Sequence, residues 1–279
     1  RDRYDVEVLC HPAEHEVLED PLLATRLEYL ESFGGDPEEV ARDYGLADPS
    51  ALTMSESAMR EYWHFPVTVD RTVEDEEILH VGERAFQIMH TPGHTPGHLS
   101  LYAPETNSLY LADVMYWPTP QYPHPVGRVD DQVESVKRCL DLDASYLYPG
   151  HELPRCGRRD VEDYLLDILL KHRQLEERIL TILSRYGSLT LPDLHAETFV
   201  ITDRYTYAND GWHGNTLNCL QGHLRRQEAM ENVTRVEIEG ETTAWKITER
   251  GRRPGPESSI HGGYERTLTL DDVRSEFLE

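Results

Sequence analysis

The chain has 279 residues, of which 38% are hydrophobic and 28% are charged, a composition typical of a globular protein with one large and one small domain. Its 52 acidic residues outnumber its 27 basic residues and give a net charge of −25, which excludes a surface that attracts nucleic-acid phosphates over most of its area. No run of about 18 apolar residues occurs, which excludes a membrane-spanning segment.

The excess of acidic residues and the scarcity of lysine favour a halophilic origin, because concentrated salt screens the self-repulsion of such a surface. The cysteines show no C-x-x-C spacing and no dense framework. They indicate ordinary thiols in a reducing compartment, so we expect a cytoplasmic protein.

In chain order, residues 5–10 predict a short strand, and residues 12–32 carry leucines near helical spacing. Residues 33–65 predict short helices and loops, with Asp36 as an N-cap before Pro37. From residue 77 the apolar residues alternate, and tight turn signals indicate an antiparallel meander. Its predicted strands are 77–81, 85–91, 98–103 and 108–114.

A helix is predicted to open at Asp130, and a short strand at 145–148 leads into Pro149-Gly150-His151. Three helices and a hairpin follow, in the order of a winged helix. They are predicted at 160–186, about 191–198, about 215–230, and 233–238 with 242–247. We therefore divide the chain into a first domain at 1–157, a winged-helix-like domain at 158–252 and a tail at 253–279.

The strongest local pattern is His90-Thr-Pro-Gly-His94-Thr-Pro-Gly-His98, which lies between two predicted strands. Its prolines and glycines fix a stiff loop that can present a neutral imidazole to a metal. Asp113 ends a later predicted strand in Leu-Ala-Asp, and His151 follows another in Tyr-Pro-Gly-His-Glu. Because strand ends collect at one rim of a sheet, these ligand-type residues are expected to converge.

In order and approximate spacing, these segments resemble the third metal-binding motif, the bridging-aspartate motif and the last histidine motif of the metallo-β-lactamase superfamily. The resemblance implies an α+β fold, a four-layer αββα sandwich with the site at one edge. It implies that His94 binds the first metal, that Asp113 bridges both metals and takes part in catalysis, and that His151 binds the second metal. Two Zn²⁺ ions are expected, with iron or manganese as alternatives.

The H-x-H-x-D-H motif of that superfamily is not found in the chain. Residues 5–21 resemble the strand and helix that follow this motif, and the chain does not begin with Met, so we expect a lost N-terminal segment rather than a degenerate motif. Each metal would then keep two ligands from this chain, where zinc usually takes three or four. We therefore expect weak or no metal binding by this chain alone, which would leave it inactive.

The histidines around these motifs have simpler explanations. His90 and His98 flank the ligand loop, and we expect them to support it through hydrogen bonds rather than to bind metal. His11 and His15 are expected to be surface residues at the start of a helix. Glu152 is either a helix cap or a hydrogen-bond acceptor behind the ligands, and the sequence does not decide between the two.

Residues 171–180, with the helices and hairpin after them, resemble the winged-helix domain of one superfamily branch, which includes hydroxyacyl-thioester-hydrolase-like proteins and single-strand-specific ribonucleases. His172 and Arg173 are expected to hold the contact between the two domains. The predicted recognition helix contains Arg225 and Arg226, but acidic residues surround them and fill the wing, which makes phosphate contacts poor. We therefore expect this domain to wall the active site or to form a homodimer contact, and nucleic acid to be an improbable partner.

Three functions remain open. The leading hypothesis is a metal-dependent hydrolase that uses a metal-bound hydroxide on a small-molecule ester, thioester or lactone. The second is a single-strand-specific ribonuclease of the same fold, for which only Arg155, Arg158 and Arg159 lie near His151 in the sequence. The third is a non-catalytic relic or winged-helix regulator. Substrate specificity is expected in the loops at 33–65 and 115–128.

Overall fold

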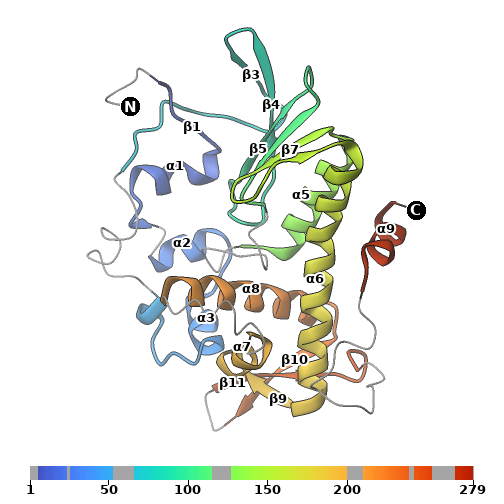
Figure 1. Ribbon diagram of the computed structural model, residues 1–279. Coiled ribbons are helices and arrows are strands. Elements are labelled where there is room, and N and C mark those ends of the chain that lie inside the picture. Colours follow the sequence, from blue (N-terminus) through green and yellow to red (C-terminus); the bar gives the residue numbers. More distant parts are fainter. Residues whose placement is uncertain are drawn as a thin grey trace.

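The computed structural model places a mixed sheet at one end of the molecule and the strands and the short helix of residues 188–199 and 233–247 at the other, joined by the long helix α6, Arg158–Tyr186 (Figure 1). Helices and strands are both present, so the α+β class predicted from the sequence is confirmed. The structure describes residues 6–23, 26–52, 66–114, 127–199, 210–238, 242–252 and 268–278.

Six strands form the larger sheet in the order β3-β4-β5-β6-β7-β8. All neighbours are antiparallel except β6 and β7, which are parallel and are separated in the chain by helix α5, Val129–Asp141. The predicted meander is confirmed to within a few residues, and its first turn uses Gly82 at a φ of 62°. The strands are β3 Ile78–Val81, β4 Arg84–His90, β5 Leu99–Ala103, β6 Ser108–Ala112, β7 Tyr146–Pro149 and β8 Arg155–Cys156.

The two faces of this sheet are both apolar. On one face Leu109 and Leu147 are fully buried in the main core, to which α5 and α6 contribute. On the other face Phe86, Tyr110 and Tyr148 lie side by side, and the rings of Tyr110 and Tyr148 stack at 4.8 Å. Apolar side chains on both faces are typical of a sheet that belongs to a sandwich.

The N-terminal region is less regular than the sequence predicts. Residues 12–32 form two helices, α1 (Pro12–Glu19) and α2 (Leu27–Ser32), instead of one helical stretch. Pro21 lies between them, and proline cannot continue a helix. The predicted first strand is reduced to β1 (Leu9–Cys10), which pairs in parallel with the unpredicted β2 (Arg71–Thr72). Residues 33–52 hold the predicted short helices, α3 (Pro37–Asp43) and the 3₁₀ helix η2 (Pro49–Leu52).

The C-terminal region follows the predicted order of helices and hairpin. Strand β9 (Ser188–Thr190) leads into α7 (Leu191–Phe199) and α8 (Asp210–Ala229). The hairpin of β10 (Val233–Ile238) and β11 (Thr242–Ile247) pairs through β11 with β9. Trp245 of β11 is fully buried. The last helix, α9 (Leu270–Leu278), packs on α6, while residues 253–267 of the predicted tail lie outside the described residues.

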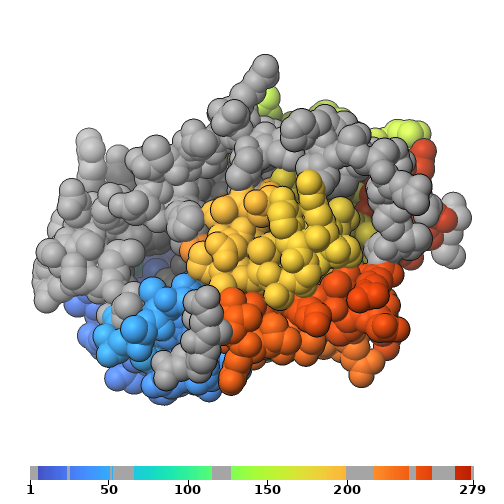
Figure 2. Space-filling view, turned by 90° about the horizontal axis from the view of Figure 1, so that it is seen from below, coloured from blue at the N-terminus to red at the C-terminus, as the bar shows by residue number. Residues whose placement is uncertain are grey.

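One hydrophobic core runs through both ends of the molecule, from Met89 of β4 to Val273 of α9. Helix α3 also lies against the C-terminal strands, as the view from below shows (Figure 2). Gln221 Nε2 donates a hydrogen bond to Asp43 Oδ2 across this contact at 2.9 Å. The predicted boundary after residue 157 coincides with the start of α6, and the division into two domains stays a prediction.

Within the described parts of the chain, the polar contacts of His172 and Arg173 lie inside the C-terminal region and not between the two ends as we predicted. His172 contacts His223 of α8, and Arg173 pairs with Glu176 and Glu276 of the C-terminal region. The reason is their position in the middle of α6, where both side chains meet other C-terminal helices. Ion pairs across residue 157 come instead from Arg158 at the start of α6 and from α8 and β10, through Arg225, Arg226 and Arg235.

All four cysteines are free thiols, as the sequence predicts, and only Cys156 is exposed. Among the described residues, no helix combines the length and the apolar character that crossing a membrane requires.

Candidate metal centre

The three predicted ligands lie at one edge of the six-stranded sheet. Strands β4, β6 and β7 run in the same direction, so their C-terminal ends meet at that edge. His94 lies in the loop after β4, Asp113 directly follows β6, and His151 follows β7 by two residues. His151 Nε2 is 3.2 Å from Asp113 Oδ1, and His94 Nε2 is 4.0 Å from Asp113 Oδ2. The structure therefore brings all three side chains together.

Each of the two imidazoles lies next to a different oxygen of the Asp113 carboxylate. A carboxylate in this position can span two cations, one oxygen to each, and imidazole and carboxylate are ligands that zinc accepts. The donor set thus fits a pair of divalent ions that share Asp113. Within the described part of the chain, no group of three or more His, Cys, Asp or Glu side chains is close enough to hold one ion.

The loop that carries His94 is tied down at both ends. Gly93 has a φ of 134°, which favours glycine, and its N–H donates to the Thr95 carbonyl at 3.2 Å. The Gly97 N–H donates to Glu14 Oε1 at 2.7 Å. Burial raises the pKa of the Glu14 carboxyl, against the opposing hydrogen bonds from Gly97 and Thr95. Helix α1 therefore supports this loop through a half-buried carboxylate that the sequence analysis did not identify.

His98 holds the start of the Asp113 loop. Its Nε2 accepts a hydrogen bond from the Asp113 N–H at 3.0 Å, so the ring proton is on Nδ1, which donates to the Thr91 carbonyl at 3.0 Å. Burial, with the nearby His94, lowers the pKa of His98 to about 4, which keeps this ring neutral. The predicted supporting role of His98 is confirmed. Ala112, just before Asp113, has a φ of 50°, an uncommon conformation for a side chain other than glycine.

His90 and His11 support the same edge from behind. His90 Nε2 lies 2.8 Å from the Pro96 carbonyl oxygen, so His90 also makes the predicted hydrogen bond to the ligand loop. The rings of His90 and His11 stack at 4.0 Å. His11 caps α1 by accepting the Ala13 N–H, as expected at a helix start, although it is half-buried rather than on the surface. The side chain of His15 is 42% exposed, and it pairs with Glu19 at 3.4 Å.

His151 is placed by the close approach of two strand ends. The Gly150 N–H donates to the Ala112 carbonyl at 2.8 Å, and any Cβ at Gly150 would collide with Asp113 Oδ1. Glu152 makes its side-chain contacts with Arg155 and Tyr164. Its carboxylate accepts hydrogen bonds from Arg155 and from the Tyr164 hydroxyl of α6, both at 3.3 Å. Of the two roles left open for Glu152, the structure supports the hydrogen-bond acceptor behind the ligands.

Comparison with known proteins gives a consistent result. The family profile described as "Metallo-beta-lactamase superfamily" matches residues 1–151. A hydroxyacylglutathione hydrolase from Chelativorans sp. is 26% identical over 178 residues, 61% of each chain. An acyl-coenzyme A thioesterase, MBLAC2 from Gallus gallus, is 30% identical over 90 residues, which are 31% of this chain and 32% of that protein. The chain thus spans about three fifths of the first relative and a third of the second.

Among solved structures, a metallo-beta-lactamase family protein from Thermus thermophilus superimposes with a TM-score of 0.64. The match covers 87% of this chain and 72% of that chain at 21% sequence identity. At this identity the likeness supports the fold alone. It extends well beyond residue 151 and therefore includes much of the C-terminal region.

Proposed function

Because the chain belongs to the metallo-β-lactamase superfamily, we propose that it carries part of the active site of a metal-dependent hydrolase that cleaves a small thioester. One observation supports the proposal above all others. His94 and His151, which are 57 residues apart in the chain (151 − 94), face opposite oxygens of Asp113 at one sheet edge. The names of the relatives, a hydroxyacylglutathione hydrolase and an acyl-coenzyme A thioesterase, narrow the ester, thioester or lactone of the sequence hypothesis to a thioester.

The residues of this chain would hold the metals and orient the reaction. When bound, two divalent cations supply Lewis acidity, which lowers the pKa of water toward neutrality and polarises a carbonyl oxygen. His94 would serve one cation, His151 the other, and Asp113 both. His98, held neutral, fixes the backbone of Asp113 through its N–H. The side chains of Asp113 and His151 are 38% and 48% exposed, so a substrate can approach from solvent.

The C-terminal region fits a structural role better than nucleic-acid binding. Arg225 pairs with Glu39 at 3.6 Å, and Arg226 pairs with Asp130 and Glu176, both at 3.2 Å. These arginines are therefore engaged inside the protein. The basic residues near His151 are also neutralised, because Arg155 pairs with Glu152 at 3.3 Å and Arg158 pairs with Asp143. Neither the ribonuclease nor the regulator hypothesis gains support from these contacts. Residues 53–65 and 115–126 of the expected specificity loops lie outside the described residues.

The proposal is tested by thioester hydrolysis at saturating zinc, since two ligands per metal predict weak binding. A hydroxyacylglutathione and an acyl-coenzyme A are the substrates. We expect Asp113→Asn to lower the rate by more than about 100-fold, beyond the effect typical of an outer-shell change. Gly150→Ala, which pushes a Cβ into Asp113 Oδ1, is expected to lower it as well. Glu105→Ala, on an exposed turn, is the control. Zinc-dependent hydrolysis that Asp113→Asn leaves intact would contradict the proposal.

A further inference from the structure

The start of helix α5 packs directly on the loop that carries His94. The Arg128 N–H donates to the Gly93 carbonyl at 3.0 Å, and Ser135 Oγ donates to the Pro92 carbonyl at 2.8 Å. A Cβ at Gly93 would collide with the backbone and Cβ of Gln132. The loop therefore has no room to shift toward the helix, and α5 sets its position.

Gln132 also reaches the loop that carries Asp113. Its Nε2 donates a hydrogen bond to the carbonyl oxygen of Val114, the residue after Asp113. Gln132 and Val114 are each only 1% exposed, so little water can replace this bond. One residue thus contacts Gly93, which precedes His94, and Val114, which follows Asp113.

We infer that Gln132 is a positioning residue for the metal centre and fixes the separation between His94 and Asp113. The inference rests on the proposed function, because it takes His94 and Asp113 as metal ligands. Gln132 belongs to α5 and not to any of the three strand ends that carry the ligands. The two ligand loops belong to β4 and β6, which are not neighbours in the sheet, since β5 lies between them. No backbone ladder therefore sets their spacing directly, whereas Gln132 touches both.

The chemistry of the side chain is suited to this role. The Val114 carbonyl is buried beyond the end of β6 and requires a donor. Glutamine supplies an N–H donor without charge, whereas methionine has nearly the same length and shape but no donor. Gln132→Met therefore removes the link to Val114 and keeps the packing against Gly93.

A second buried glutamine provides a matched control. Gln221 of α8 is also 1% exposed, and its Nε2 donates to Asp43 Oδ2 of α3 at 2.9 Å. Neither α3 nor α8 carries a predicted ligand. Gln221→Met thus removes a buried amide donor away from the metal centre, where the acceptor is a carboxylate instead of a backbone carbonyl, and it measures the effect of losing a buried amide hydrogen bond elsewhere in the fold.

The experiment titrates each purified variant with Zn²⁺ and follows the imidazole NMR signals of His94 and His151, alongside urea unfolding without metal. For Gln132→Met we expect the dissociation constant for zinc to rise at least about tenfold, the effect typical of residues that orient metal ligands. For Gln221→Met we expect a change of less than about threefold, although the unfolding midpoint should fall in both variants. Equal zinc affinities in Gln132→Met and the wild type would overturn the inference.

The outcomes also separate this inference from the proposed function. Zinc binding at His94 and His151 without thioester hydrolysis would reject the proposed activity. The role of Gln132 would then still be decided by comparing the zinc dissociation constants of Gln132→Met and the wild type. Zinc that leaves both imidazoles of the wild type unperturbed would overturn the inference and the site together. If Gln132→Met does not fold, Gln132→Asn, whose amide is too short to reach Val114, replaces it. Failure of both variants to fold would assign Gln132 to folding and reject the positioning role.

Discussion

Two groups of histidine and carboxylate side chains in this molecule differ in almost everything except residue type. At the sheet edge, His94 and His151 face Asp113, which is 38% exposed. In the interior, where α5, α6 and α8 meet, His172 and His223 lie close to Glu176, and all three are at least 97% buried. Burial, rather than residue type, separates a site that a ligand can reach from a structural cluster.

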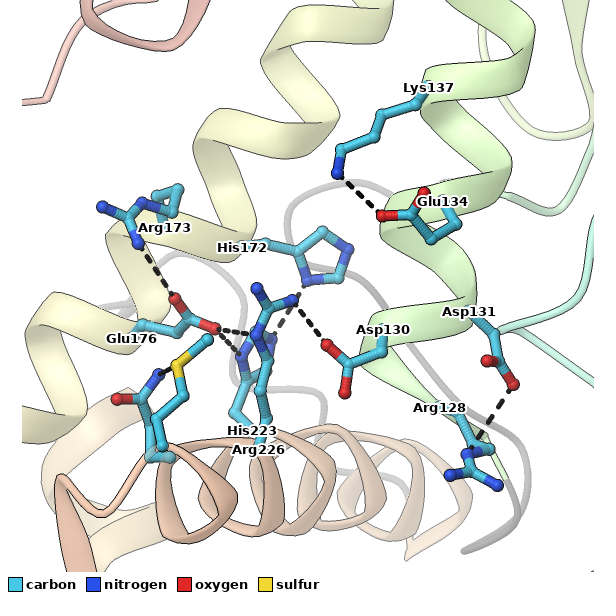
Figure 3. Close-up of polar contacts among 12 residues, drawn as sticks. Arg128, Asp130, Asp131, Glu134, Lys137, His172, Arg173, Glu176, His223 and Arg226 are labelled. Atoms are coloured by element: carbon cyan, nitrogen blue, oxygen red, sulfur yellow. Dashed lines mark hydrogen bonds and ion pairs between the residues drawn. The ribbon is translucent and has the colours of Figure 1, made fainter. Parts of the chain in front are cut away.

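The members of the interior group contact one another through one hydrogen bond and several ion pairs (Figure 3). His172 Nδ1 is 3.1 Å from His223 Nε2, and His223 Nδ1 is 3.5 Å from Glu176 Oε1. Arg226 Nε is 3.2 Å from the same oxygen, and an Nη of Arg226 reaches Asp130 of α5 at 3.2 Å. Burial would raise the pKa of Glu176, but His223 and Arg226 outweigh it and keep that pKa below its usual value. The group therefore binds three helices through a buried carboxylate.

Removal of that carboxylate should give the largest effect on stability. Glu176→Ala leaves Arg226, Arg173 and His223 around a buried position with no negative charge, which typically costs about 3–5 kcal/mol. The free energy of unfolding, measured with urea, should fall by this amount. Glu105→Ala, on an exposed turn, should change nothing measurable. A loss below about 1 kcal/mol in Glu176→Ala would mean that the interior group is not a structural cluster.

The next largest effect is expected in how the free energy of unfolding changes with pH, which should differ between the interior His172 and an exposed histidine. Burial, with His223 and Arg226 nearby, lowers the pKa of His172 well below 6.5. Between the two pKa values the unfolded chain binds a proton that the folded chain does not, so the free energy of unfolding falls as pH drops below about 6.5. The slope is at most about 1.4 kcal/mol per pH unit for one group.

Urea unfolding in EDTA between pH 7.5 and 5.5 measures this slope. His172→Asn, which cannot take up the proton, should show a shallower slope than the wild type, while His15→Asn, at a 42% exposed side chain of α1, should not. Glu176 keeps its charge across this range, because its pKa lies below its usual value, and it contributes no slope of its own. Identical slopes in the wild type and His172→Asn would show that His172 is not kept neutral by the fold.

Much of the fold and the main features of the site were predictable from local patterns. The alternation of apolar residues located β3 to β6, and the bounds of β10 and β11 were predicted without error. His94, Asp113 and His151 were predicted to converge because each follows a strand, and strands that run in one direction end at one edge. The sequence patterns that predict these strands and ligands lie within a few residues of the strand or ligand concerned.

The residues that support the site were not predictable in this way. Glu14 acts on Gly97, 83 residues away, and Gln132 acts on Val114, 18 residues away. In the sequence, Glu14 is one of many acidic residues on a helix, and Gln132 is a polar residue beside the apolar face of another. Neither has a local pattern that sets it apart. The partner of Glu14 is a backbone N–H, which every residue but proline offers, and the partner of Gln132 is a backbone carbonyl, which every residue offers. Their roles follow only from the packing of α1 and α5.

Salt should give the smallest effect, and it tests the comparison most directly. With a net charge of −25, the surface repels itself at low salt, and the screening length falls from about 10 Å at 0.1 M to about 3 Å at 1 M. Raising KCl from 0.1 to 2 M should therefore stabilise the wild type, as expected for a halophilic chain. Buried pairs are screened much less than exposed charges. The stability lost in Glu176→Ala should thus be the same at both salt concentrations, although the wild type and the variant both gain stability. If the loss shrinks in 2 M KCl, Glu176 is exposed to solvent ions, and the two groups of histidine and carboxylate differ less than their burial indicates.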